Sequence, residues 1–177
     1  MNDQVRIKRI KKVALFLPFL VFALLAGVFL SQLGKDSQYM PSALIGYPMP
    51  DFTLVELEAD QLMTKSDLGS ESYLVNFWGT WCPACSYEHE YLMTLSEQGI
   101  RIVGIDYKDD RQEAVKWLQE KGNPYTHVLL DEIGKFGINM GVTGAPETFV
   151  VNSEGIVTYR HQGIVNNQVW QEMKEFM

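Results

Sequence analysis

The strongest hydrophobic pattern along the chain is an apolar run from Val13 to Leu30, 18 residues without a charged side chain. A helix rises about 1.5 Å per residue, so this run would reach about 27 Å, close to the hydrocarbon thickness of a bilayer. Pro18 is unfavourable in a water-soluble helix but is tolerated in a membrane-spanning one. The pattern therefore predicts a transmembrane helix over residues 13–30, in preference to a buried core helix.

The flanks of this run decide between an uncleaved anchor and a cleaved signal peptide. Residues 1–12 hold five basic residues and one acid, which suits either class. Residues 28–34 show no small-x-small cleavage site, and the run exceeds the roughly 7–15 apolar residues of a signal peptide. We therefore expect an anchor whose basic tail, residues 1–12, stays in the cytoplasm and places everything after residue 30 on the far side.

Beyond the anchor, residues 31–45 are polar and end in turn-forming residues, which is typical of a tether. From residue 46 to residue 177, short β-rich runs alternate with helical patterns, as in an α/β domain with a mixed sheet. The patterns predict an edge strand over 52–57, a central strand over 73–78, strands over 100–107 and 127–130, a hairpin of 147–152 and 156–160, and helices over 83–98, 109–121, 133–140 and 169–176. Residues 58–70 fit either a hairpin turn or an irregular insert.

Charge is distributed unevenly along the chain. Residues 1–12 carry a net +4, which leaves −11 on the rest of a chain whose net charge is −7. So acidic a domain offers no basic patch for nucleic acid, and we exclude nucleic acid as a partner. The acidic surface favours solubility and would steer the domain toward a basic partner.

The chain has only two cysteines, Cys82 and Cys85. A domain whose fold is stabilised by disulfide bonds has more cysteines, and they are spread through the chain. A bond between residues three apart closes a small loop and constrains little of the unfolded chain. We therefore expect this pair to react instead of stabilising the fold.

The residues around the pair indicate how it reacts. Cys82 follows a predicted buried strand and begins a helix, where unpaired backbone N–H groups and the helix dipole favour a thiolate. Because thiolate is the attacking species in thiol–disulfide exchange, Cys82 is the candidate nucleophile, with a depressed pKa and an exposed sulfur. Cys85, one turn later, lies within disulfide reach and can resolve a mixed disulfide. Pro83 suits the first helical turn, and Trp81 is expected to shield one side of the site.

Three other interpretations of the cysteines fit less well. Two structural cysteines would not usually flank Pro-Ala at a strand-to-helix turn. A zinc site needs four ligands, and His89 lies about 10.5 Å along the helix from Cys82, so we expect His89 to pack or to lie at the surface. A peroxiredoxin would need a proline-x-x-x-Thr-x-x-Cys pattern, which is missing before Cys82. We therefore expect no metal site and no cofactor.

A second motif, Gly144-Ala-Pro-Glu-Thr-Phe149, stands directly before a predicted strand, and its proline is a place where a cis peptide bond can occur. Together with Trp81-Cys-Pro-Ala-Cys85, it resembles the cytochrome c maturation thiol:disulfide interchange proteins, the DsbE/CcmG family. The resemblance covers the chain from Ser42 to the last helix and includes the anchor. The stretches that share the family's character are residues 42–46, 104–111, 122–125 and 159–163.

The resemblance implies a thioredoxin-like fold in which a cis Pro146 packs against the cysteine pair and the backbone of Ala145 contacts an extended substrate segment. It implies a disulfide reductase that acts on the heme-binding cysteines of apocytochrome c, or on a thioredoxin-like haem-ligation partner. Electrons would come from a membrane-embedded thiol reductase. Such a protein is held in the inner membrane by a single span, with its catalytic domain in the periplasm. The alternatives are a general extracytoplasmic disulfide reductase and, from another class, a copper-binding chaperone.

Two positions depart from the expected patterns. Ordinary thioredoxins carry a buried aspartate six residues before the first cysteine, but this chain has Asn76, which cannot titrate. The family uses acidic groups near the site instead, and the candidates are Glu88, three residues beyond Cys85, and Glu147. Their carboxylates would oppose thiolate formation, unless both are solvated surface acids. Thr143 stands where we expect an aromatic residue, which would change one groove wall.

Overall fold

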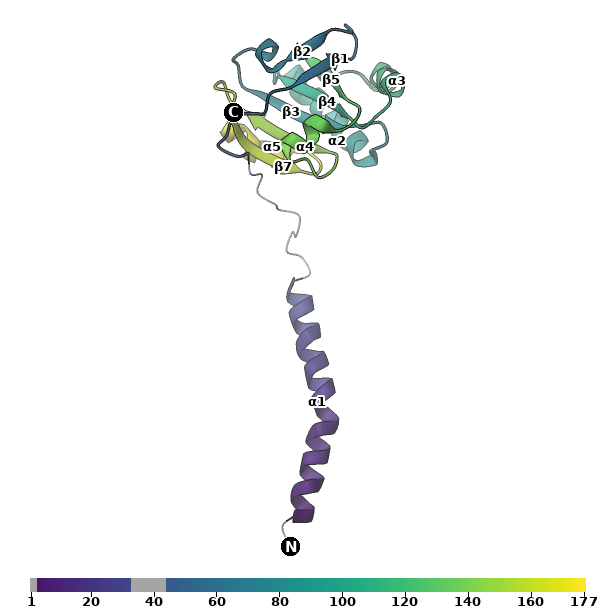
Figure 1. Ribbon diagram of the computed structural model, residues 1–177, viewed down its shortest axis with the longest axis vertical. Helices are drawn as coiled ribbons and strands as arrows, with labels where there is room; N and C mark the ends of the chain where they lie inside the picture. The colour runs from purple at the N-terminus through teal and green to yellow at the C-terminus, as the bar shows by residue number, and fades with distance from the viewer. Residues whose placement is uncertain (1–2, 33–43) are drawn as a thin grey trace. The chain divides into compact units, whose positions relative to one another are not determined.

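The computed structural model describes residues 3–32 and 44–177, with the side chains of residues 16–30 and 44–177. These residues form two compact units, one before and one after residues 33–43 in the sequence (Figure 1). The predicted tether, residues 31–45, therefore lies largely outside the described residues.

The N-terminal unit is a single helix, α1 (Asp3–Gln32), with Pro18 inside it. Its large apolar side chains between residues 16 and 30 are exposed. Among the residues whose side chains are described, no helix combines the length and the hydropathy needed to cross a membrane.

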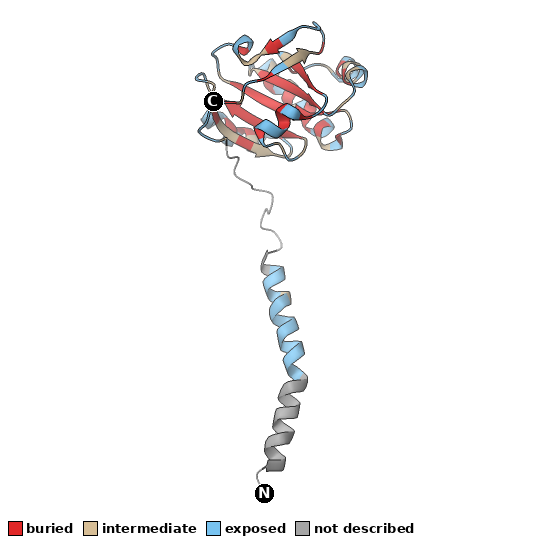
Figure 2. Ribbon diagram, viewed as in Figure 1, coloured by how far each residue is buried: buried red, intermediate tan, exposed pale blue. Residues whose placement is uncertain are grey.

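The C-terminal unit is built on a seven-stranded sheet with the strand order β2-β1-β5-β4-β3-β6-β7. The three central strands β5, β4 and β3 run parallel, and the strands on either side of them pair antiparallel. The strands are β1 (Thr53–Glu56), β2 (Leu62–Thr64), β3 (Tyr73–Trp78), β4 (Ile102–Tyr107), β5 (His127–Asp131), β6 (Glu147–Val151) and β7 (Val157–Gln162). Every residue of β3, β4 and β6 is buried, because helices cover both faces of the sheet (Figure 2).

Helices α2 (Pro83–Glu97), α3 (Arg111–Lys121) and α5 (Asn167–Met173) contribute apolar side chains to the core on one face of the sheet. The short helices α4 (Lys135–Met140) and η1 (Lys65–Leu68) contribute to the core on the other face, and η2 (Lys174–Phe176) follows α5. Local sequence sets these helices: the Asp110 carboxylate caps the N-terminus of α3, and the Asn166 side chain caps α5. Gly99 takes a φ of +83° just beyond α2, a conformation that glycine adopts without strain.

The structure confirms the predicted mixed sheet flanked by helices, with β3 as an interior strand. The prediction of an edge strand over 52–57 is wrong, because β2 pairs along the outer side of β1 and forms the edge itself. Residues 58–70, which the sequence left open, contain the turn between these two strands, then β2 and η1. The other predicted elements are present, with ends that differ by up to about three residues.

Candidate active site

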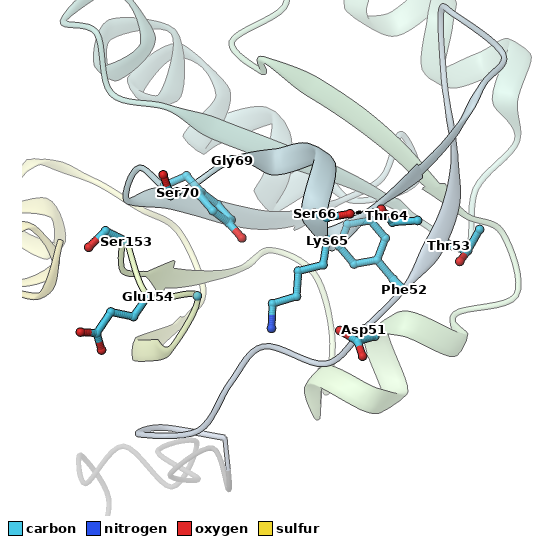
Figure 3. A pocket seen from close by; sticks show the side chains of 12 residues that line it. Asp51, Phe52, Thr53, Thr64, Lys65, Ser66, Gly69, Ser70, Ser153 and Glu154 are labelled. Carbon is cyan, nitrogen blue, oxygen red and sulfur yellow. Dashed lines mark hydrogen bonds between the residues drawn. The ribbon is translucent and has the colours of Figure 1, made fainter.

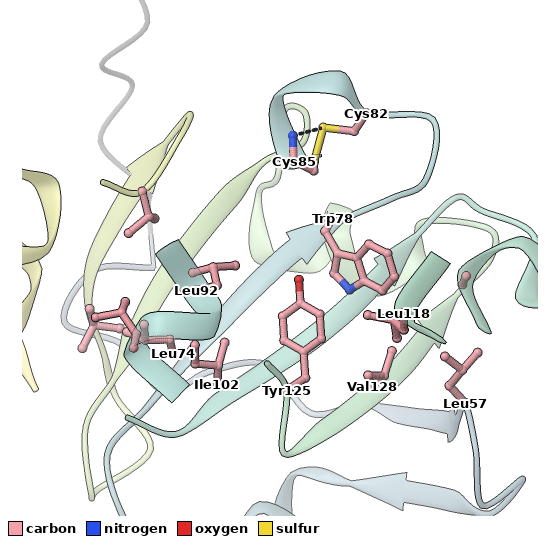
Figure 4. Packing of buried hydrophobic residues seen from close by; sticks show 14 of the residues in the cluster. Leu57, Leu74, Trp78, Cys82, Cys85, Leu92, Ile102, Leu118, Tyr125 and Val128 are labelled. Carbon is pink, nitrogen blue, oxygen red and sulfur yellow. Dashed lines mark hydrogen bonds between the residues drawn. A yellow bond between two sulfur atoms is a disulfide. The ribbon is translucent and has the colours of Figure 1, made fainter. Parts of the chain in front are cut away.

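The cysteine pair lies where β3 passes into α2. A turn closed by a hydrogen bond from Cys82 N to Gly79 O follows the strand, and Cys82 is the N-cap residue of α2 with Pro83 at its first position. Cys82 and Cys85 are joined by a disulfide, and Cys85 N donates to Cys82 Sγ at 3.1 Å (Figure 4). The helix start therefore directs a backbone N–H group at the sulfur of Cys82, as its N-cap position requires.

The expectation that the Cys82 sulfur is exposed is wrong for this oxidised state. Cys82 and Cys85 are each only 2% exposed. Both belong to the apolar cluster that includes Trp78 and Tyr125, over which Figure 4 shows the disulfide lying. A partner thiol can therefore reach Cys82 only when the groups that cover it move.

Trp81 is held beside the pair by the backbone of β4. Its indole Nε1 donates to Tyr107 O at 3.0 Å, and half of the side chain stays exposed. A Cβ on Gly79 would lie 2.4 Å from that nitrogen, so only glycine leaves room for the ring in this position. The turn before Cys82 thus presents an apolar surface with a fixed orientation.

Behind the disulfide cluster, Asn76 and Glu88 form a buried polar network. Asn76 Nδ2 donates to Glu88 Oε1 and to Thr148 Oγ1, each at 2.9 Å, and Asn76 Oδ1 accepts from the Tyr125 hydroxyl at 3.0 Å. The other Glu88 oxygen accepts from Val165 N at 2.9 Å. Burial raises the pKa of Glu88 to about 7, although both of these hydrogen bonds lower it.

This network changes the interpretation of Glu88 drawn from the sequence, and it brings two further residues, Tyr125 and Thr148, into the site. Glu88 is not a solvated surface acid, since it is only 1% exposed. Tyr125 and Thr148 join Asn76 from distant parts of the sequence. Both lie in stretches that carry the family resemblance, but the sequence predicts a role for neither. Burial is also the main cause of the Tyr125 pKa lying well above its usual value, with Glu88 and Asp106 adding to the effect.

The second motif forms the loop that enters β6. The Ala145–Pro146 peptide bond is cis, as the resemblance implied. Glu147 is 1% exposed, so it is not a surface acid either; it forms a buried ion pair with Arg160 and accepts from Thr143 N at 3.1 Å. Thr143, in place of the expected aromatic residue, thereby ties this loop to the start of β6.

His89 packs in the interior, one of the two outcomes that its sequence position predicts. It is 5% exposed, its ring lies edge-on to Trp117 with centroids 4.4 Å apart, and Nε2 lies 3.1 Å from Gly122 O. Burial is the main cause that lowers its pKa.

A cavity of about 620 Å³ lies away from the cysteines, between η1, the start of β1 and the turn of the β6–β7 hairpin (Figure 3). Lys65 lines it, and its Nζ donates to Met49 O at 2.6 Å. The cavity contains none of the residues predicted for the site. This cavity is therefore separate from the cysteine site.

Comparison with known proteins agrees with this geometry. The Redoxin family matches residues 44–174. The thiol:disulfide interchange protein DsbE of Vibrio cholerae is 46% identical over 167 residues, 91% of each chain, and DsbE of Escherichia coli K12 is 46% identical over 169 residues, 92% of this chain and 91% of its own.

Two solved structures share the fold at low identity. The thioredoxin domain of a Bacteroides vulgatus thiol-disulfide oxidoreductase has a TM-score of 0.65 at 20% identity, covering 76% of this chain and 99% of its own. A DsbF homologue from Corynebacterium diphtheriae has a TM-score of 0.67 at 19% identity, and the match covers 81% of this chain and 96% of the homologue. The chain therefore has a thioredoxin-like fold, belongs to the DsbE family of thiol:disulfide interchange proteins, and is a thiol:disulfide oxidoreductase.

Proposed function

We propose that Cys82 and Cys85 carry out the exchange and that the chain works as a disulfide reductase. The observation that carries the proposal is the disulfide at the start of α2, with the Cys85 backbone N–H on Cys82 Sγ. In the reduced protein the same N–H group and the helix dipole would stabilise a Cys82 thiolate, and Pro83 occupies a position whose missing N–H costs nothing.

The reaction then follows in two steps. The Cys82 thiolate attacks a partner disulfide, which forms a mixed disulfide and releases one partner thiol. Cys85 loses its proton and attacks Cys82 Sγ, which releases the second partner thiol and leaves the Cys82–Cys85 disulfide. Two electrons pass to the partner in each cycle, and a dithiol donor must return them.

The direction of electron flow is supported by Glu88. When ionised, its buried carboxylate opposes thiolate formation nearby and raises the thiol pKa values. A less stabilised dithiol gives up electrons more readily, which is the behaviour of a reductant. Glu147, fixed by Arg160, instead positions the loop that carries Ala145 and Pro146. We assign that loop, together with Trp81, to contact with an extended substrate segment.

The physiological substrates we propose are the heme-binding cysteines of apocytochrome c, or a thioredoxin-like haem-ligation partner. A membrane-embedded thiol reductase would restore the dithiol. The family membership supports this assignment, and the acidic domain would favour a basic partner.

We further propose the domain layout of a single-pass inner-membrane protein. Residues 1–12 form the cytoplasmic tail, 13–30 the anchor, 31–45 the tether and 46–177 the periplasmic domain. The basic tail and the uncharged apolar run support this layout. We expect the full chain to stay in carbonate-washed membranes and its domain to be cut by protease added to spheroplasts. Release by carbonate would contradict the anchor, and protection from protease would contradict the orientation.

A trapping experiment tests the exchange itself. With Cys85→Ser, the second step is blocked, so Cys82 should accumulate in a mixed disulfide with its substrate, and the double Cys82→Ser/Cys85→Ser variant should trap nothing. Apocytochrome c or a ligation factor in the trapped species supports cytochrome c maturation, whereas a broad set of other proteins points to a general reductase. Stoichiometric copper on the reduced domain, without trapping, would contradict exchange.

A further inference from the structure

The turn before Cys82 is held from the side by the segment that follows β4. Thr80 N donates to one carboxylate oxygen of Asp109, and Thr80 Oγ1 donates to the other at 2.9 Å. Asp109 also accepts from Asp110 N at 2.8 Å. The Asp109 carboxylate thus links the active-site turn to the N-terminus of α3.

A second carboxyl group, that of Asp106, lies next to this link inside the domain. Asp106 is 1% exposed and pairs in register with Trp78 on β3. In the part of the chain that the structure describes, neither of its oxygens has a hydrogen-bond donor, and the Trp78 indole nitrogen has no acceptor. A buried carboxylate without any donor would be costly, so the protonation state of Asp106 needs an explanation.

Asp109, three residues further along the chain, acts on Asp106 both through its charge and through a side-chain hydrogen bond. Two carboxyl groups can hydrogen-bond only when one of them carries a proton. Both Asp109 oxygens already accept hydrogen bonds from Thr80 and Asp110, so Asp109 acts as the acceptor of the pair. The proton therefore belongs on Asp106, which donates it to Asp109.

The electrostatic surroundings agree with this assignment. Burial is the largest cause that raises the pKa of Asp106, to about 8, and Asp109, Asp110 and Glu132 raise it further through their charge. Tyr125, before β5, also faces the group and keeps its own proton, because its pKa lies far above neutrality. No cation is among the groups that act on Asp106 in the described residues. These surroundings therefore favour the protonated, uncharged form of Asp106.

We propose that Asp106 is a positioning residue for thiol–disulfide exchange, whose carboxylic acid proton holds Asp109 against Thr80 and so fixes the turn that presents Cys82. This inference rests on the proposed role of Cys82 in the reaction. It follows that the exchange reaction should slow at high pH, where Asp106 loses its proton. When Asp106 ionises, two adjacent negative charges repel each other, and the hold on Thr80 weakens.

The substitutions Asp106→Asn and Asp106→Leu separate this role from simple packing. Asparagine keeps an N–H donor toward Asp109 but cannot ionise, whereas leucine of similar size has no donor. Glu154→Gln, in the exposed β6–β7 turn, removes one acid far from the site and serves as the matched control.

The measurement is the rate at which the reduced full-length chain, in detergent, reduces oxidised glutathione from about pH 6 to about pH 10. At neutral pH we expect Asp106→Asn to react as the parent does and Asp106→Leu about tenfold more slowly, as for a lost bond to a charged group. At pH values high enough to ionise Asp106 in the parent, the rate of Asp106→Asn divided by the rate of the parent should rise about tenfold. Glu154→Gln should follow the parent throughout.

Three outcomes would overturn the proposal. Parent and Asp106→Asn could give the same rate at every pH, or Asp106→Leu, shown by circular dichroism to be folded, could react as fast as the parent. A parent protein that leaves the glutathione disulfide intact would overturn the role of Cys82 as well. Only this last result also contradicts the proposed function, so the two failures are distinguishable.

Discussion

The side-chain amide of Asn76 donates a hydrogen bond to Glu88 Oε1 at 2.9 Å, across the boundary between β3 and α2. Asn76 occupies the position, six residues before Cys82, where ordinary thioredoxins carry their buried aspartate. The carboxyl group of this network is therefore on α2, one turn beyond Cys85, and β3 supplies the neutral Asn76 side chain that holds it. A carboxyl with a pKa of about 7 in this place can change its charge near neutral pH.

This relationship predicts how Glu88 affects stability. Its pKa rises from 4.5 to about 7 on folding, so between these values the folded state holds a proton that the unfolded chain has lost. Stability therefore falls as pH rises through this window and stays lower above it. Glu88→Gln removes the effect, and by pH 8 it should be more stable than the parent by about 3 kcal/mol, less any loss in hydrogen bonding.

Urea unfolding of the oxidised protein at about pH 4, 6 and 8 measures this difference. The stabilisation should be absent at the lowest pH and grow toward the highest, while Glu154→Gln should show no such trend. A difference between Glu88→Gln and the parent that does not change with pH would contradict the buried, titrating carboxyl.

The second prediction concerns the buried ion pair of Glu147 and Arg160. Arg160→Met leaves the Glu147 carboxylate without its counter-charge and should cost about 3–5 kcal/mol of folding free energy. The double Glu147→Met/Arg160→Met variant should recover most of this loss, because no isolated charge remains. Denaturant unfolding of both single variants and the double variant gives the coupling energy. Equal losses in Arg160→Met and the double variant would contradict the pairing.

A matched surface pair provides the control. Arg111 and Asp60 lie 2.6 Å apart, but Asp60 is 72% exposed in its side chain. Asp60→Asn should therefore change stability by less than about 1 kcal/mol.

The sequence predicted β3 and α2 well because their signals are local. Six consecutive buried residues form β3, and Cys82, Pro83 and Gly99 mark the two ends of α2 within a short stretch. The sequence did not predict β2, because the three residues Leu62–Thr64 form a strand only through pairing with β1. That pairing also displaced β1 from the edge of the sheet.

The site was predictable in its cysteines but not in the state of its acids. Whether Glu88 is solvated depends on Val165, 77 residues away, whose N–H group reaches the carboxylate. Glu147 is buried because Arg160 arrives from the next strand of the hairpin. Asp106 lies in the predicted strand over 100–107, but the sequence does not indicate its protonation state, since its environment comes from Trp78 across the sheet and from Asp109 in the following loop. Burial of an acid is set by these long-range partners.

The third prediction tests the neutral partner in the network. Asn76→Asp places a second carboxyl within hydrogen-bond distance of Glu88, and two buried carboxyls must share one proton. Near pH 4 the variant should lose only about 1 kcal/mol, because a protonated Asp donates one hydrogen bond where the Asn76 amide donates two. At pH 8 the loss should grow by more than about 2 kcal/mol. Unfolding measured with Glu88→Gln in the same chain should abolish most of this loss. A loss that is unaffected by Glu88→Gln would mean that the two side chains do not interact.

The fourth prediction concerns the fit between Gly79 and Trp81. A Cβ at residue 79 would lie 2.4 Å from the Trp81 indole nitrogen, which donates to Tyr107 O at 3.0 Å, so Gly79→Ala must displace the ring and break this bond. We expect a loss of about 1–3 kcal/mol in stability, typical of overpacking, and a slower exchange with substrate. With Trp81→Ala already present, the added methyl group meets no ring, so Gly79→Ala should then cost less than about 0.5 kcal/mol. A double-mutant cycle on unfolding free energy and on the exchange rate checks both effects. Additive losses would show that the backbone at residue 79, and not contact with the Trp81 ring, requires glycine.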